Sequence, residues 1–309
     1  MILLQQMMVL FIIMMIGFLC RRIGLINEQG SRMLSGIVVN VANPALILSS
    51  SANKESTIQG KELAVTLGLA VCFYLILLVL AEVVPRLLRV NRSDYGVYKA
   101  MTVFSNVGFM GFPLLSAMYG SEALLYASLF TIPFNILIYT YGVSSMRKIE
   151  ESKKEEKQSI QWSKIFNIGV IFSIIAVVLY LTRLPVPKVI TDAAGTIGNL
   201  TAPLSMIVIG DAMSQMKLRE LITDKKLMLF TALKLLVIPI IGLFIVKQLG
   251  LSLMLNGVFL VMLATPVGSM TAMLAQQYDG NYELASRGVA LTTLLSVITM
   301  PIVSLIMGI

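Results

Sequence analysis

The chain has 309 residues, of which 57% are hydrophobic and 13% are charged, and its mean hydropathy is +0.87. Soluble domains carry roughly 25% charged residues, so this composition predicts an integral membrane protein in contact with a lipid bilayer. The formal net charge is +8, but the basic residues are scattered over short loops without interleaved aromatic residues, which argues against nucleic-acid binding. The sequence has no histidine, and its two cysteines, Cys20 and Cys72, lie inside apolar segments. We therefore expect no disulfide framework, no metal site and no cofactor.

Charged and turn residues divide the chain into ten apolar segments. Each is close to the length of about 20 residues that an α-helix needs to cross a bilayer. The expected spans are 2–20, 33–53, 63–84, 99–119, 123–146, 165–183, 193–214, 227–247, 253–277 and 286–307. The first span lacks a preceding basic segment and is followed directly by Arg21 and Arg22, so we interpret it as a retained helix and not as a signal peptide.

The distribution of Lys and Arg over alternate loops predicts the orientation. With the N-terminus outside, 18 basic residues fall on the inner side and 5 on the outer side. This bias predicts a multi-pass protein of the plasma or inner membrane with both termini outside. The mixed-charge run after the fifth span predicts a cytoplasmic linker, 147–163, with a docking or regulatory role as the alternative. This linker would join two five-helix halves, 1–146 and 164–309.

An internal repeat relates the two halves. Segments 105–110 and 265–270 carry matching interruptions 160 positions apart, and segments 40–44 and 199–203 match at an offset of 159. Five crossings per half is an odd number, so the second half would enter the membrane from the opposite side. The sequence thus predicts an all-α membrane fold of ten helices in a 5+5 inverted repeat. The alternative is a chance likeness between apolar segments.

The matching interruptions lie inside the fourth and ninth expected spans. Gly108, Gly111 and Pro113 together disfavour a continuous fourth helix, because proline removes a backbone hydrogen bond and glycine adds freedom. The half-helix that follows such a break exposes N–H groups with partial positive charge, which suit a carboxylate. In an inverted repeat the two spans run antiparallel, so both breaks can point their half-helix N-termini at one ligand.

The side chains at the breaks are small, polar and uncharged, and Asn106 is the first candidate to bind the ligand. An asparagine amide can hold a carboxylate oxygen without an opposing buried charge; a local helix cap is the alternative role. The other candidate substrate-binding residues are Ser105, Gly108, Thr265, Pro266, Gly268, Ser269, Asn40 and Asn43. The alternative role of the hydroxyl groups is a hydrogen bond to the backbone of their own helical turn. The alternative role of Asn40 and Asn43 in span two is a hydrogen bond between helices. The candidate helix-break residues are Gly111, Pro113, Pro44 and Pro203.

Two ionisable residues lie at depth in the expected spans and are candidates for ion coupling. Lys234 falls within span eight and Asp211 near the inner end of span seven, and such residues are functional candidates by default. They could neutralise one another, or Lys234 could attract an anion while Asp211 carries a proton. Snorkelling towards the cytoplasmic surface is the alternative.

Segments 40–46, 105–114, 202–204 (with Gly210) and 264–268 resemble the auxin efflux carrier family. That family includes plant PIN auxin exporters and bacterial permeases for malate or malonate. The resemblance implies a fold shared with bile-acid symporters and sodium/proton antiporters, with crossed broken helices four and nine in a domain that moves as an elevator. It also implies a homodimer through scaffold helices 1, 2, 6 and 7, and a carboxylate held by Asn106.

The sequence therefore predicts a secondary transporter for a small organic anion such as malate, malonate or an auxin-like acid, and not an enzyme. The alternatives are a sodium-coupled organic-anion symporter of the bile-acid type, a channel or sensor on the same fold, and an intramembrane enzyme that uses Asp211. Sodium usually takes several oxygen ligands, often with a carboxylate, whereas the expected crossing offers only neutral oxygens. Proton coupling or passive flow is thus favoured over sodium coupling.

Overall fold

The computed structural model describes residues 2–51, 60–146, 168–215, 224–278 and 280–308. The predicted linker 147–163 lies outside these residues. Within the described ranges the regular secondary structure is helical, apart from one isolated antiparallel bridge between Ser105 and Val267.

The first half of the chain forms helices that are interrupted or widened at several points. Its elements are α1 (Ile2–Arg22), α2 (Glu28–Ile37), η1 (Val38–Ala42), α3 (Asn43–Ser51), α4 (Gly60–Leu87), η2 (Arg92–Asp94), α5 (Tyr95–Val103), η3 (Val107–Gly111), α6 (Phe112–Tyr119), α7 (Ser121–Leu137), η4 (Ile138–Gly142) and α8 (Val143–Met146). Of these, η1, η3 and η4 have π-helical hydrogen bonds and η2 is a 3₁₀ turn.

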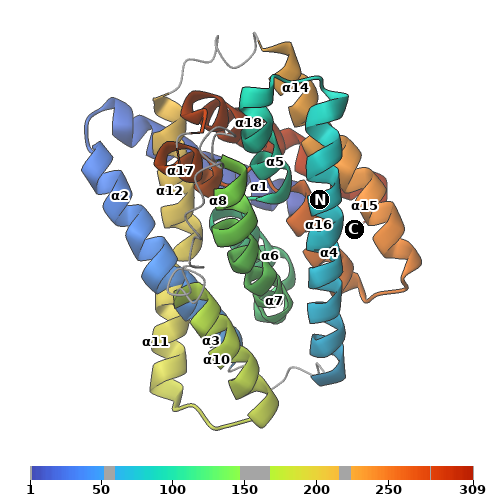
Figure 1. The fold of residues 1–309 in the computed structure, drawn as a ribbon. Coiled ribbons are helices and arrows are strands. Elements are labelled where there is room, and N and C mark those ends of the chain that lie inside the picture. The colour runs from blue at the N-terminus through green and yellow to red at the C-terminus, as the bar shows by residue number, and fades with distance from the viewer. Residues whose placement is uncertain (1, 52–59, 147–167, 216–223, 279, 309) are drawn as a thin grey trace, which may run out of the picture.

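The second half of the chain is also helical, and its described part contains the π segment η6. Its described elements are α10 (Ile168–Thr182), α11 (Lys188–Gly198), α12 (Thr201–Ser214), α14 (Lys225–Ala232), η6 (Leu233–Val237), α15 (Ile238–Gln248), α16 (Leu253–Ala264), α17 (Ser269–Gln277) and α18 (Tyr282–Met307). In Figure 1, α2, α11 and α12 lie on the left of the molecule and α4 and α15 on the right, with α5, α6, α7 and α8 between them.

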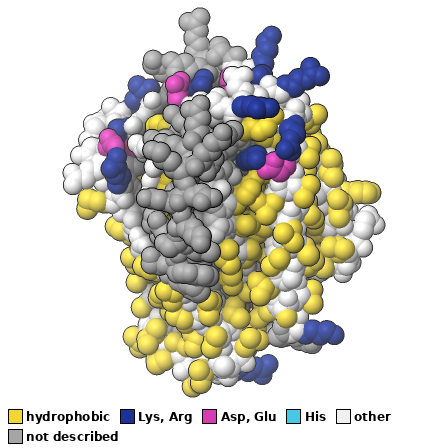
Figure 2. Space-filling model, in the orientation of Figure 1, with side chains coloured by type: hydrophobic (Ala, Val, Ile, Leu, Met, Phe, Trp, Pro, Cys, Tyr) yellow, Lys and Arg dark blue, Asp and Glu magenta, His cyan; other side chains and the backbone are white. Residues whose placement is uncertain are grey.

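Six helices of the described chain are long and apolar enough to cross a membrane. They are Glu28–Ser50, Lys61–Leu87, Glu122–Met146, Lys188–Ser214, Lys225–Lys247 and Tyr282–Met307, and shorter apolar helices occupy Val107–Tyr119, Ile168–Thr182 and Leu253–Ala264. On the face in Figure 2, Lys and Arg side chains lie at the two ends of the molecule, with hydrophobic side chains in a band between them. This is the surface of an integral membrane protein; the layout of ten spans remains a prediction.

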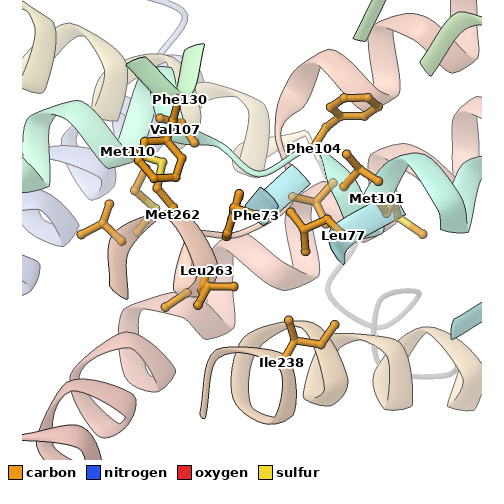
Figure 3. Close-up of a cluster of buried hydrophobic side chains, with 14 of the residues drawn as sticks. Phe73, Leu77, Met101, Phe104, Val107, Met110, Phe130, Ile238, Met262 and Leu263 are labelled. Carbon is orange, nitrogen blue, oxygen red and sulfur yellow. The ribbon is translucent and has the colours of Figure 1, made fainter. Parts of the chain in front are cut away.

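The hydrophobic interior surrounds the two interrupted helices. Phe73 of α4, Phe130 of α7 and Phe259 of α16 pack edge to face, with ring centroids 5.3–6.0 Å apart, a favoured arrangement of aromatic pairs. Figure 3 shows these helices meeting at buried side chains, among them Leu77, Met101, Phe104, Val107, Met110, Ile238, Met262 and Leu263. The breaks are therefore enclosed by protein on several sides.

Glycines allow α1 and α12 to pack backbone against backbone. A Cβ atom added at Gly17 would lie 2.3 Å from the carbonyl oxygen of Ile207, and one at Gly210 would lie 1.9 Å from that of Met14. Such distances leave no room for any side chain. In the absence of a hydrophobic driving force within lipid, close approach at small residues is a main source of attraction between helices. We conclude that α1 and α12 form one tightly packed pair.

Candidate functional site

The first interrupted helix unwinds at residues 104–106. Helix α5 ends at Val103, Phe104 has an extended backbone (φ −97°, ψ 95°), and helical geometry resumes at Val107, the first residue of η3. The second interruption covers residues 265–268, between the end of α16 at Ala264 and the start of α17 at Ser269. Each interruption leaves backbone groups that its own helix cannot satisfy.

These two interruptions satisfy one another's backbone groups. The amide of Asn106 donates to the carbonyl of Pro266 at 2.7 Å, and the amide of Gly268 donates to the carbonyl of Phe104 at 2.9 Å. Together with the bridge between Ser105 and Val267, these bonds place the two unwound segments side by side and antiparallel. The helices therefore cross at their breaks.

Four helix ends meet at this crossing. The helices α5 and α16 end there and present carbonyl groups, whereas η3 and α17 begin there and present N–H groups. Aligned peptide dipoles give a helix N-terminus a partial positive charge and a C-terminus a partial negative charge. The crossing consequently brings together two helix ends with partial positive charge and two with partial negative charge.

The side chain of Asn106 is buried at the beginning of η3. Its Oδ1 accepts a hydrogen bond from the backbone amide of Phe109 at 3.3 Å, which is the capping role that the sequence leaves as an alternative. Among the contacts of the described residues, none engages its amide nitrogen. Asn106 thus caps a half-helix and still has hydrogen-bond donors to offer a ligand.

The two asparagines of the expected second span lie in different surroundings. Asn43 is buried, and its Nδ2 donates to the carbonyl of Gly108 at 3.4 Å, which connects α3 to the first break. Its Oδ1 is buried without a hydrogen-bond partner in the described part of the chain. Asn40 is exposed and donates to the carbonyl of Gly36 in its own helix, so the structure does not bring it to the crossing.

Three hydroxyls of the second break differ in their surroundings. The side chains of Thr265 and Thr271 are fully buried, and neither Oγ1 has a hydrogen-bond partner among the described residues. Ser269 is half-buried at the first position of α17. A buried polar group without a partner is costly, so these hydroxyls are available to a bound ligand or water.

Predicted helix-break residues lie mostly in first turns after a break or a π segment. Pro113 occupies the first turn of α6 and Gly111 ends η3, while Pro44 follows η1 in the first turn of α3. Pro203 lies in the first turn of α12. At Pro44 and Pro113 the helix continues from a π segment, so irregular hydrogen bonding lies next to a residue that has no N–H to donate.

The two ionisable residues at depth have separate partners. Lys234 is fully buried on η6, and its Nζ donates to the carbonyl of Thr102 at 3.0 Å and to the Oγ of Ser105 at 2.8 Å. Asp211 is also buried, but its Oδ1 lies 3.5 Å from the Nη1 of Arg21 on α1. Lys234 and Asp211 therefore do not neutralise one another.

Sequence reasoning missed two residues that support these groups. Thr292 of α18 accepts a hydrogen bond at its Oγ1 from the amide of Val267 at 3.1 Å, and so holds the second break from a third helix. The sequence predicts Arg21 in a loop after the first span, whereas it lies at the end of α1 and pairs with Asp211. The sequence carries no signal for either partner, since both contacts join segments far apart in the chain.

Comparison with known proteins identifies the family. A sequence profile of the family described as "Membrane transport protein" matches residues 2–304. The chain belongs to this family, that of the auxin efflux carriers. It is 25% identical over 307 residues to an uncharacterized transporter of Methanothermobacter thermautotrophicus, covering 96% of this chain and 95% of that protein. It is also 22% identical over 299 residues to an uncharacterized transporter of Methanocaldococcus jannaschii, with 94% of each covered.

Membership of this transporter family agrees with the apolar helices and makes the protein a multi-pass membrane transport protein. The family resemblance expected from segments 40–46 and 105–114 is thereby confirmed. Membership of a transporter family is consistent with a function of this protein other than catalysis.

Proposed function

We propose that the protein is a secondary carrier that moves a small organic anion, such as malate, malonate or an auxin-like acid, by alternating access. The observation that carries this proposal is the pair of backbone hydrogen bonds that joins the two helix breaks at one crossing. Two half-helices begin there, and their first-turn N–H groups suit a carboxylate. The pairing of broken helices at one point is also the arrangement around which many secondary transporters bind their substrates.

The uncharged side chains at the crossing favour a carboxylate that must be released again. The Asn106 amide nitrogen supplies donors, and the hydroxyl of Thr265 is a buried group that has no other partner in the described part of the chain. Hydrogen bonds to a charged ligand are stronger than neutral ones. Asn106 and Thr265 would therefore bind the acid through hydrogen bonds and not through a fixed ion pair.

The inverted repeat of five plus five helices belongs to the same proposal. Asn106 and Pro266, which are hydrogen-bonded across the crossing, lie 160 positions apart, which is also the offset of the sequence repeat. An approximate two-fold axis through the crossing would exchange these two residues. We place the halves at 1–146 and 164–309, joined by the cytoplasmic linker 147–163.

In an elevator movement, the domain that contains the two crossed helices would slide past a fixed scaffold domain. The close pair of α1 and α12 supports a rigid scaffold built from spans 1, 2, 6 and 7, through which two copies would associate. Asn43 links that scaffold to the first break through a hydrogen bond to Gly108 of 3.4 Å. The excess of basic residues in alternate loops supports a cell-membrane orientation with both termini outside.

Flux into liposomes tests the proposal. Purified protein is reconstituted and assayed for uptake and counterflow of labelled malate, malonate and indole-3-acetate, with Asn106→Ala alongside. Loss of a hydrogen bond to a charged group costs about 1.5–3 kcal/mol, so we expect uptake at low substrate concentration to fall about tenfold or more.

Asn27→Ala is the matched control. Asn27 also caps a helix, because its Oδ1 accepts from the amide of Gly30 at 2.7 Å, but it lies at the exposed start of α2. This control removes a cap without touching the crossing and should leave flux unchanged. Equal flux in the wild type and the Asn106 variant would remove Asn106 from the site, and flux without saturation or counterflow would favour a channel.

A further inference from the structure

Lys234 places a basic group at the crossing, against the last turn of α5 and the first break. Its helix, formed by α14, η6 and α15, widens into a π segment at 233–237, and the residue is 1% exposed. Single π turns inside α-helices occur often at functional sites. The Nζ donates to Thr102 in the last turn of α5 and to Ser105 within the first break.

Among the described residues, Lys234 has no carboxylate partner. Its two acceptors are a backbone carbonyl and a hydroxyl, and Asp211, the counter-ion considered from the sequence, pairs with Arg21. A buried charge without compensation is unfavourable, so a charged ammonium at this position requires another source of negative potential.

The ends of the broken helices supply that potential. Helix α5 ends at Val103, one residue after the carbonyl that accepts from Lys234, and η6 also packs on α16, which ends at the same crossing. Helix C-termini carry a partial negative charge. In secondary transporters, the C-terminal ends of half-helices and unwound carbonyls are general binding positions for coupling cations such as sodium.

We infer that the ammonium of Lys234 is a resident cation that occupies the position at the C-terminal ends of the broken helices where an inorganic cation would otherwise bind. The Lys234 ammonium then compensates the partial negative charge of the helix C-termini, and no sodium ion is needed at this position. The carrier consequently moves its acid without a sodium requirement. This consequence for transport rests on the proposed function, whereas the presence of a cation position can be tested on the folded protein alone.

The first test measures the melting temperature of detergent-purified protein in matched concentrations of sodium chloride, ethylammonium chloride and choline chloride. Lys234→Ala removes the amine and leaves a space in its place, and we expect a melting temperature lower by about 3 °C or more. Sodium or ethylammonium should restore part of that loss, and the bulkier choline should not. The wild type should melt at the same temperature in all three salts.

Two further variants separate charge from packing. Lys234→Met keeps most of the side-chain volume without charge, and we expect it to be destabilised like the alanine variant. Lys226→Ala is the matched control, because Lys226 lies on the same helix and its Nζ donates to the carbonyl of Arg89 at 2.7 Å from an exposed position. Its melting temperature should remain that of the wild type in every salt.

The second test measures acid uptake by wild-type liposomes in sodium and in choline. Equal uptake supports the inference, and uptake that rises several-fold with sodium overturns it, even if the Lys234 variants fail to fold. A Lys234→Met variant as stable as the wild type would also overturn it, as would a destabilised alanine variant that neither sodium nor ethylammonium rescues. If no acid is transported, the proposed function fails, and the thermal test still decides the cation position.

Discussion

At the scale of single residues, the candidate substrate-binding side chains at the two breaks are polar but uncharged. The sequence identifies Asn106 and Thr265 as polar groups in an apolar setting, and the structure places both in the buried crossing. The sequence cannot tell which of Asn40 and Asn43 faces the crossing. The π segment at Val38–Ala42 changes the angular position of residues around that helix. Such a segment has no sequence signature that we recognise.

Thr292 is predicted to hold the second break in place. Thr292→Val keeps the side-chain shape but removes the acceptor for the amide of Val267, which leaves a buried donor unpaired. Such a loss costs about 1–3 kcal/mol, and we expect a lower melting temperature. In the control Thr293→Val, the lost hydroxyl bonds only to Val289 of its own helix. Similar melting temperatures for the two variants would contradict this role.

At the scale of helices, glycine and proline indicate where a span is irregular but not which residues unwind. The segments without helical geometry are 104–106 and 265–268, whereas Gly111 and Pro113 lie in the helical turns that follow. Pro113 comes six residues after Val107, where the second half-helix begins, so it does not mark the unwound residues. The exact unwound residues depend on the hydrogen bonds between the two breaks, which no local pattern contains.

The pair of α1 and α12 is predicted to depend on Gly210. Gly210→Leu would force a side chain into the carbonyl of Met14, so the two backbones must separate. Overpacking typically costs about 1–3 kcal/mol, and we expect a lower melting temperature together with reduced flux. Gly36→Ala is the control, because open space surrounds Gly36 on α2 and alanine favours a helix. Equal stability of the two variants would contradict close packing at Gly210.

At the scale of the whole molecule, composition and motifs suffice for the class and the family, because both depend on properties spread over the chain. The membrane class and the transporter family are confirmed, and the ten-span inverted repeat remains a prediction. Contacts between distant segments could not be predicted from one sequence. The pair Arg21–Asp211 and the bonds of Lys234 to Thr102 and Ser105 each join residues more than 100 positions apart.

The central claim is that the two helix breaks meet to form one cradle for a carboxylate. An experimental map of the protein, determined with the acid that gives the highest flux in liposomes, tests it most directly. The account predicts density for the acid at the beginnings of η3 and α17, within hydrogen-bonding distance of Asn106. Continuous helices through residues 104–106 and 265–268, or acid bound away from this crossing, would contradict it.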